Sequence, residues 1–198
     1  MKYQKLPAKF ALTLVLSFIT SQSYAVGLGF SFGAGSEEWE EDRVQLGDRD
    51  IRNMGFVVDT TVARDKIFNY RFSFLKEENN SSNSGLDMDG YAMTHDFGFG
   101  VVRTKHIRLW LGPQLKGSLY NDVYVGSTNA RTVDDVIGFG FGPVIGLNVH
   151  VPQVVSFSFT AAYHFMSAYS GDYVNGDTFD ADSTGLYFNA ALIFRINE

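Results

Sequence analysis

The residues of this chain that could do chemistry include a glycine-rich run at 136–151, VIGFGFGPVIGLNVHV. Gly138, Gly140 and Gly142 stand at alternate positions. Glycine-rich loops bind phosphate through their backbone amides when a helix follows the glycines. Here the following residues, PVIGLNVHV, themselves have the character of a strand. The glycines therefore indicate a strand with one small face rather than a phosphate loop.

Histidine and serine side chains could support nucleophilic catalysis, which needs a hydroxyl within hydrogen-bond reach of a base. His164 is predicted to share one strand face with Ser158 and Thr160. Residues two apart on a strand are separated by about 7 Å, so no hydroxyl of this face reaches the imidazole locally. His95 is predicted on the outward face of another strand. The sequence therefore predicts no enzyme, and a lipid A or phospholipid acyl hydrolase or transferase stays as the alternative.

Two acidic stretches could bind a cation or a surface partner. The first contains Glu37, Glu38, Glu40, Glu41 and Asp42. The second contains Asp172, Asp177, Asp180 and Asp182. Calcium takes six to eight oxygen ligands, and neither stretch has the spacing of a known calcium loop. We expect solvated loops that could contact a partner, and we expect neither a metal site nor a cofactor.

The N-terminal residues predict export. Three lysines precede an apolar run at 10–20, and small residues stand at Ser23 and Ala25, which is the pattern of a secretory signal peptide. We expect a cleaved signal at 1–25 and one domain at 26–198. The chain has no cysteine, which excludes disulfides and thiolate metal sites. Its formal charge of −6 becomes more negative when the signal lysines are removed, which argues against a nucleic-acid partner.

The elements that must position these residues are strands, because apolar residues recur at every second position. Eight such segments lie at about 26–35, 54–62, 68–74, 91–102, 107–116, 136–151, 155–165 and 184–197. Several hold the nine or more residues that a tilted strand needs to cross a bilayer. One face is rich in Phe, Leu and Val, and the other carries Gly, Ser, Thr, Asn and a few charges. With connections that alternate between short and long, the pattern predicts an all-β protein, an eight-stranded antiparallel up-and-down transmembrane β-barrel.

Side-chain pairing supports a narrow lumen filled by side chains. Across the tight link at 63–66, Asp59 is predicted opposite Arg71 on the inner face, where a charge needs a partner. In two further hairpins a large inward residue is predicted opposite glycine: Gly98 with Trp110, and Gly138 with His164. Eight strands enclose just enough room for side chains, so this complementarity argues against a general pore.

The predicted polar network of the lumen consists of Asp59, Arg71, Asp96, Arg108, Lys116, His164, Tyr187 and Arg195. Two prolines, Pro113 and Pro143, fall on neighbouring strands of this barrel. Because proline removes a donor from the ladder, they predict a bulge or a local widening.

The chain resembles the small eight-stranded outer-membrane barrels, the OmpA-like and opacity-protein-like class of Gram-negative bacteria. The most specific part of the resemblance is the C-terminal pattern Asn189-x-Ala191-x-x-Phe194-x-Ile196, which is similar to the signal that the barrel-assembly machinery reads. Ala191 stands where the family has glycine, Ile196 stands where it has an aromatic residue, and two residues follow.

The resemblance implies an outer-membrane location, with outer-membrane lipid, lipopolysaccharide and the assembly machinery as partners. We expect a non-catalytic barrel that serves envelope integrity or surface interaction through four long loops. The sequence does not identify the partner of these loops. Besides the lipid-modifying enzyme, the alternatives are a small pore and a soluble periplasmic lipocalin-like binder.

Overall fold

The computed structural model describes residues 26–41, 44–60, 67–81, 86–125, 130–133, 135–151, 154–172 and 178–196. Its strands are β1 (Gly27–Glu41), β2 (Val44–Asp59), β3 (Phe68–Ser81), β4 (Leu86–Arg103), β5 (Ile107–Val125), β6 (Ala130–Val133), β7 (Val136–Val151), β8 (Val155–Asp172) and β9 (Thr178–Arg195). The predicted signal peptide at 1–25 lies outside the described residues. In the part of the chain that is described, no helix is long and apolar enough to cross a membrane.

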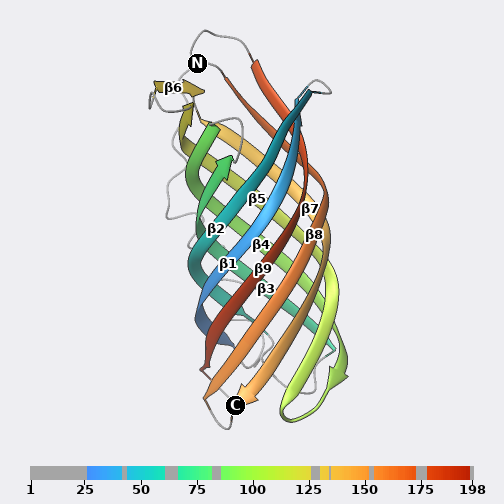
Figure 1. Cartoon of the computed structure of the whole chain (residues 1–198). Coiled ribbons are helices and arrows are strands. Elements are labelled where there is room, and N and C mark those ends of the chain that lie inside the picture. The colour runs from blue at the N-terminus through green and yellow to red at the C-terminus, as the bar shows by residue number, and fades with distance from the viewer. Residues whose placement is uncertain are drawn as a thin grey trace, which may run out of the picture.

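The strands form a closed antiparallel ring, as the sequence predicts. Each long strand pairs with its neighbours along the chain, β9 pairs with β1, and the short β6 pairs only with the end of β5. The described ring therefore has eight members, and its strands are strongly tilted (Figure 1). The amide of Ile196 donates to the carbonyl of Val26, so the two ends of the ring meet at one rim. We call the opposite rim, which carries the β1–β2 and β8–β9 connections, the outer end.

The strands are longer than predicted, and the prediction of four long loops is wrong. The eight strands of the ring have 14 to 19 residues, whereas a tilted strand crosses a bilayer with about 9 to 11. The stretch 36–53 is almost entirely the paired outer halves of β1 and β2, where Glu37 lies opposite Arg49 and Trp39 lies opposite Gly47. Gly47 has a φ of 94° next to a register shift, which is the backbone of a bulge that favours glycine.

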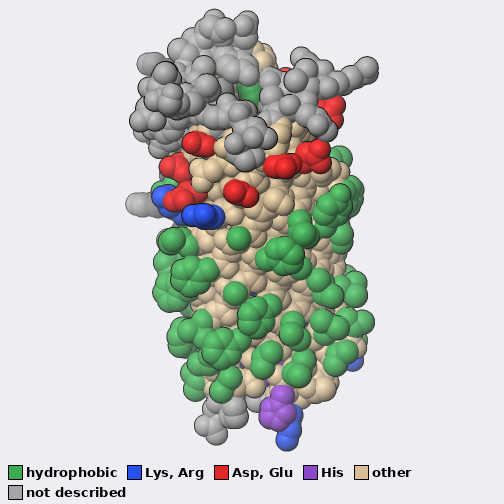
Figure 2. Space-filling view, in the orientation of Figure 1, with side chains coloured by type: hydrophobic (Ala, Val, Ile, Leu, Met, Phe, Trp, Pro, Cys, Tyr) green, Lys and Arg blue, Asp and Glu red, His purple; other side chains and the backbone are tan. Residues whose placement is uncertain are grey.

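The outward side chains form a belt of large apolar residues around the inner part of the barrel. Figure 2 shows this belt, with acidic side chains gathered above it. Leu28, Phe30, Phe32, Phe56, Phe99, Ile137, Phe139, Phe157, Phe159 and Phe188 are among its exposed members. Soluble monomers rarely expose a continuous apolar surface of this kind. A soluble lipocalin-like binder would turn these faces inward, so that alternative is wrong.

Above the belt the chemistry of the two faces is reversed. The inward side chains there form a buried apolar cluster of Trp39, Met88, Tyr120, Val136, Tyr169, Phe179 and Ala181. The outward side chains form what we call the acidic collar: Glu38, Glu40, Asp48, Asp50, Asp87, Asp89, Asp172, Asp180 and Asp182. This reversal explains the error about the loops, because the outer strand halves have the composition of a solvated segment on their outward face.

The predicted register of the first tight hairpin is correct, and two other predicted registers are wrong. Asp59 lies opposite Arg71, as expected. Trp110 lies opposite Gly100 instead of Gly98, next to a register shift in the β4–β5 ladder. Gly138 lies opposite Tyr169 instead of His164. The β7–β8 register already differs from the prediction at the turn, where Val151 lies opposite Val155, and the bulge farther along shifts it by only one residue.

Two interruptions of the strand ladders lie beside a pair of prolines. Pro113 lies directly opposite Pro143, and the β5–β7 register continues unchanged through both. Because neither residue has an N–H group, they can face each other only as a non-hydrogen-bonded pair. The interruptions fall on the far sides: the β4–β5 pairs lapse at Phe97 and Gly98, and the β7–β8 register shifts between Phe141 and Val144. The local widening therefore lies beside the proline pair rather than between its members.

Candidate functional site

The lumen of the barrel is the candidate site. An ion pair from the β2–β3 hairpin lies in its inner third. The Arg71 Nη2 donates to Asp59 Oδ2 at 2.8 Å, and both side chains are almost fully buried. The same nitrogen donates to Asn148 Oδ1 at 3.1 Å, and the guanidinium lies 5.1 Å from the centre of the Trp110 ring. The charge of Arg71 is therefore compensated within the lumen.

A second group lies at the middle of the lumen and joins three strands through Gln114. The Gln114 Nε2 donates to Asp96 Oδ1 at 2.6 Å, and its Oε1 lies 2.8 Å from His164 Nε2. His164 Nδ1 and Ser167 Oγ both approach the space beside Gly140, but no hydrogen bond joins them in the described chain. His164 and Ser167 are both buried and therefore form no accessible catalytic pair. A serine–histidine hydrogen bond of 2.8 Å does join Ser156 Oγ and His150 Nδ1 near the inner end, and both of those side chains are buried too.

A third group at the outer end holds two buried carboxylates around one ammonium. Lys116 Nζ lies 2.7 Å from Glu77 Oε1 and 3.9 Å from Glu37 Oε1. The Tyr120 hydroxyl donates to Glu77, and the Tyr187 hydroxyl donates to Glu37. These residues come from four strands, β1, β3, β5 and β9, so the group ties together half of the ring.

Aromatic residues complete this group as a cage. The Trp39 Nε1 donates to Glu37 at 2.5 Å, and its ring stacks on Tyr169 with centroids 4.1 Å apart. Aromatic faces with carboxylates attract cations. Both cation positions are filled by the chain itself, since Arg49 lies 4.5 Å over the Trp39 ring and Lys116 lies 4.4 Å over the Tyr187 ring. Side chains of the chain itself therefore occupy both of these cation positions.

Electrostatics at the outer end follow from burial. Glu37 lies beyond the belt, and burial raises the pKa of its carboxyl from the ordinary value of 4.5, while Lys116 opposes the rise. Burial also lowers the pKa of Arg49, and the nearby Glu37 carboxylate opposes that fall. The low-dielectric interior strengthens each attraction and also makes any uncompensated charge costly.

The structure corrects the expected role of the first acidic stretch. Glu37 is 2% exposed and belongs to the lumen plug, so its prediction as a loop ligand is wrong. Glu38 and Glu40 are exposed on β1, and Asp172, Asp180 and Asp182 are exposed on β8 and β9. Glu41 belongs to β1, while Asp42 and Asp177 lie outside the described residues. Among the residues described, no group of three or more such side chains is arranged to hold a metal ion.

The remaining predicted lumen residues close the inner end. Arg195 Nη2 donates to the carbonyl of Val151 at 2.8 Å. Arg108 Nη2 lies 3.5 Å from the carbonyl of Ile67, and the Arg108 side chain is buried. Both cations therefore contact backbone oxygens at the turns.

Sequence reasoning missed several members of the lumen groups and one outward pair. Glu77, Arg49, Asn79, Gln114 and Tyr169 were not singled out, although each has the inward parity of its strand. The outward pair is a hydrogen bond of 2.6 Å between the Tyr70 hydroxyl and His95 Nδ1. Cross-strand partners depend on register, which alternation alone does not give.

Comparisons with known proteins agree with this geometry. No protein-family model matches the sequence, and no curated protein matches it. Among solved structures, the outer membrane protein OprG from Pseudomonas aeruginosa matches with a TM-score of 0.58 and 10% identity, covering 91% of this chain and 100% of OprG. The chain has the fold of the small eight-stranded outer-membrane β-barrels.

A second match supports the same fold. Neisserial surface protein A matches with a TM-score of 0.50 and 11% identity, over 85% of this chain and 97% of that protein. Identities this low establish the fold and nothing more specific. Together with the apolar belt, the fold places this barrel in the outer membrane.

Proposed function

We propose that the chain is a non-catalytic outer-membrane barrel of a Gram-negative bacterium that acts through its outer surface, in envelope integrity or surface interaction. The observation that carries this proposal is the plugged lumen. Its inward charges are held by partners such as Asp59 with Arg71 and Glu77 with Lys116, and apolar side chains fill the outer end. The interior of an eight-stranded barrel is just wide enough for side chains to fill.

Biogenesis in this proposal follows the sequence signals. The segment 1–25 acts as a cleaved signal peptide. The barrel-assembly machinery reads the end of β9, where Asn189 and Ala191 are half-buried and Phe194 and Ile196 are exposed to the membrane side. Because β9 pairs with both β8 and β1, this strand closes the ring.

The proposed partners are outer-membrane lipid and lipopolysaccharide. The acidic collar stands directly above the belt, at the level where lipid headgroups meet water (Figure 2). Carboxylates at this level can reach lipid phosphates through bridging divalent cations, since such cations prefer oxygen ligands. The collar also gives the outer end a negative potential that would attract a basic partner.

Fractionation combined with gel migration tests the location and the folded barrel. The protein should remain with outer membranes after a salt wash, and unboiled samples should migrate differently from boiled samples. A protein recovered mainly as a soluble periplasmic species would refute the proposal.

Conductance in planar bilayers tests the plugged lumen. The folded protein should give no steady ohmic steps, because both ends of the lumen are filled. Reproducible unitary steps that persist in independent preparations would instead support the small pore.

Lipid analysis tests the absence of catalysis. Mass spectra of lipid A and phospholipids should be the same in cells with and without the protein. A change in acylation that disappears in the His164→Ala variant would support the lipid-modifying enzyme.

A further inference from the structure

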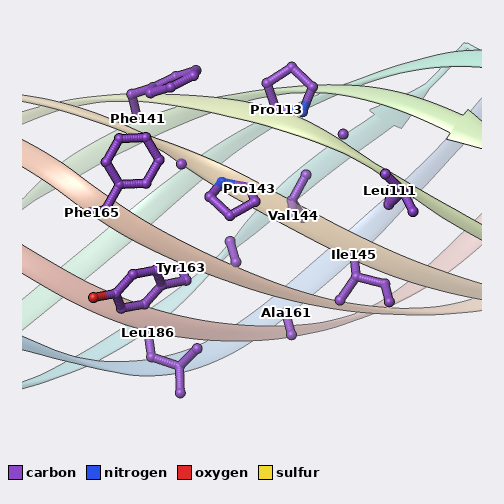
Figure 3. A pocket seen from close by; sticks show the side chains of 13 residues that line it. Leu111, Pro113, Phe141, Pro143, Val144, Ile145, Ala161, Tyr163, Phe165 and Leu186 are labelled. Carbon is purple, nitrogen blue, oxygen red and sulfur yellow. The ribbon is translucent and has the colours of Figure 1, made fainter.

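A groove of about 630 Å³ crosses the outward face of the barrel within the apolar belt. Figure 3 shows it around Pro143, with Phe141 and Phe165 at one end and Leu111 and Ile145 at the other. The two phenylalanine rings meet edge to face with centroids 5.5 Å apart. The groove therefore has tall hydrocarbon walls over a floor of small residues.

The groove exists because the β7–β8 ladder is interrupted there. The register shifts between Phe141 and Val144, and the β8–β9 register shifts at the same level between His164 and Ser167. A Cβ atom added at Gly142 would collide with the backbone carbonyl of Tyr163, so the backbones approach too closely for any other residue. Gly142 and Pro143 thus leave a seam of small residues along the floor.

The floor of the groove is only one side chain thick. Val144 and Ala162 line the groove, yet each is 2% exposed and belongs to the same buried cluster as Trp110. A molecule seated on this floor therefore lies close to the indole inside the lumen. Trp110 and Trp39 are the two tryptophans of the chain, so a fluorescence readout of this position is available.

We propose that this groove holds one acyl chain of an outer-membrane lipid. The proposal rests on the membrane location proposed above and names a lipid site within it. Among the described side chains that line the groove, Tyr163 alone carries a polar atom. The groove is also continuous with the lipid-facing belt, since Leu111, Ile145 and Phe165 belong to both.

The shape of the groove favours a single chain over a protein partner. A second barrel presents a convex wall, which touches the rims of a narrow groove and leaves the floor empty. An acyl chain is flexible and thin, so it can follow the small residues Gly142, Pro143 and Ala161 along the seam. Inside the membrane there is no hydrophobic driving force for binding, because the lipid tails are themselves apolar. The free energy of binding comes instead from van der Waals contacts between the acyl chain and the floor of the groove, which would be missing if the floor stayed empty.

Native mass spectrometry of the full-length folded barrel tests this site. The barrel is reconstituted in vesicles of phosphatidylethanolamine and phosphatidylglycerol and then released in mild detergent. Ala161→Phe fills the groove from its floor, and Ala190→Phe is the matched control on the outward face of β9, away from the groove. The wild type and A190F should retain one more phospholipid than A161F. Equal retention by all three proteins would overturn the proposal, and so would a dimer that A161F abolishes.

Quenching by phospholipids brominated on their acyl chains gives a second readout. In a Trp39→Phe background, Trp110 is the sole tryptophan, and the quenching of its emission should fall in A161F but not in A190F. If A161F does not fold, Ala161→Leu provides a smaller filling residue. Heat-modifiable migration on gels separates a failure of the lipid-groove proposal from a failure of the proposed membrane location. A folded membrane barrel with equal quenching in all variants overturns the groove alone, while a soluble protein overturns the proposed location.

Discussion

Lys116→Met should be strongly destabilising, because Lys116 is the ammonium between two buried carboxylates. At an effective dielectric constant of about 20, unit charges 2.7 Å apart attract by about 6 kcal/mol, which the desolvation of the ammonium partly offsets. Removing one partner of a buried pair costs about 3–5 kcal/mol, since the remaining charge is uncompensated. Methionine keeps most of the side-chain volume, so the loss reports the charge.

Urea unfolding in detergent micelles, followed by tryptophan fluorescence, measures this loss. Lys76→Met is the matched control, because Lys76 is about half exposed and lies 3.5 Å from an exposed Glu78. Surface pairs of this kind contribute at most about 1 kcal/mol. The double variant Lys116→Met with Glu77→Gln should be more stable than Lys116→Met alone, since it removes one unpaired carboxylate. A cost below about 1 kcal/mol for Lys116→Met would refute the reasoning.

Three further predictions concern the plug and the seam. The pKa of Glu37 is raised in the folded barrel, so its carboxyl favours folding below pH 4.5 and loses that contribution as pH rises through the folded pKa. The stability of the wild type relative to Glu37→Gln should therefore fall as pH rises above 4.5 in urea titrations, and a constant difference would contradict this sign. Gly142→Ala should cost about 1–3 kcal/mol through its collision with the Tyr163 carbonyl, whereas Gly117→Ala, with open space at its Cβ position, should be close to neutral in the same assay. Trp39→Ala should lower stability by about 3–5 kcal/mol by emptying the aromatic cluster, and thermal unfolding that matches the wild type would refute its role in the plug.

The fold was predictable because alternation is a local signal. Each segment of the belt repeats every second residue, and this period is strict enough to assign both faces without knowing any contact. The pair of Asp59 and Arg71 was also predictable, since its residues are only 12 positions apart across a tight turn. Within one hairpin, a short turn leaves few possible registers, and the need to pair a buried charge selects among them.

The outer strand halves were not predictable from the same signal. There the outward face is acidic and the inward face is aromatic, so the segment around Glu37 and Trp39 has the composition of a loop. The register at Gly138 was also not predictable, because two strands can slide past each other and still keep inward residues opposite inward residues. Neither error affected the number of strands in the ring.

The sequence by itself determined the fold class, the apolar belt, the inward parity of charged residues within the belt such as Asp59 and Arg71, and the position of the proline irregularity. Only the tertiary structure decided the partners within the lumen. Glu37 meets Tyr187 across 150 positions of sequence and Lys116 across several strands, and these contacts exist only once the ring has closed. The physical reason is that strand pattern is set by neighbours along the chain, whereas compensation of a buried charge depends on side chains from every wall of the barrel.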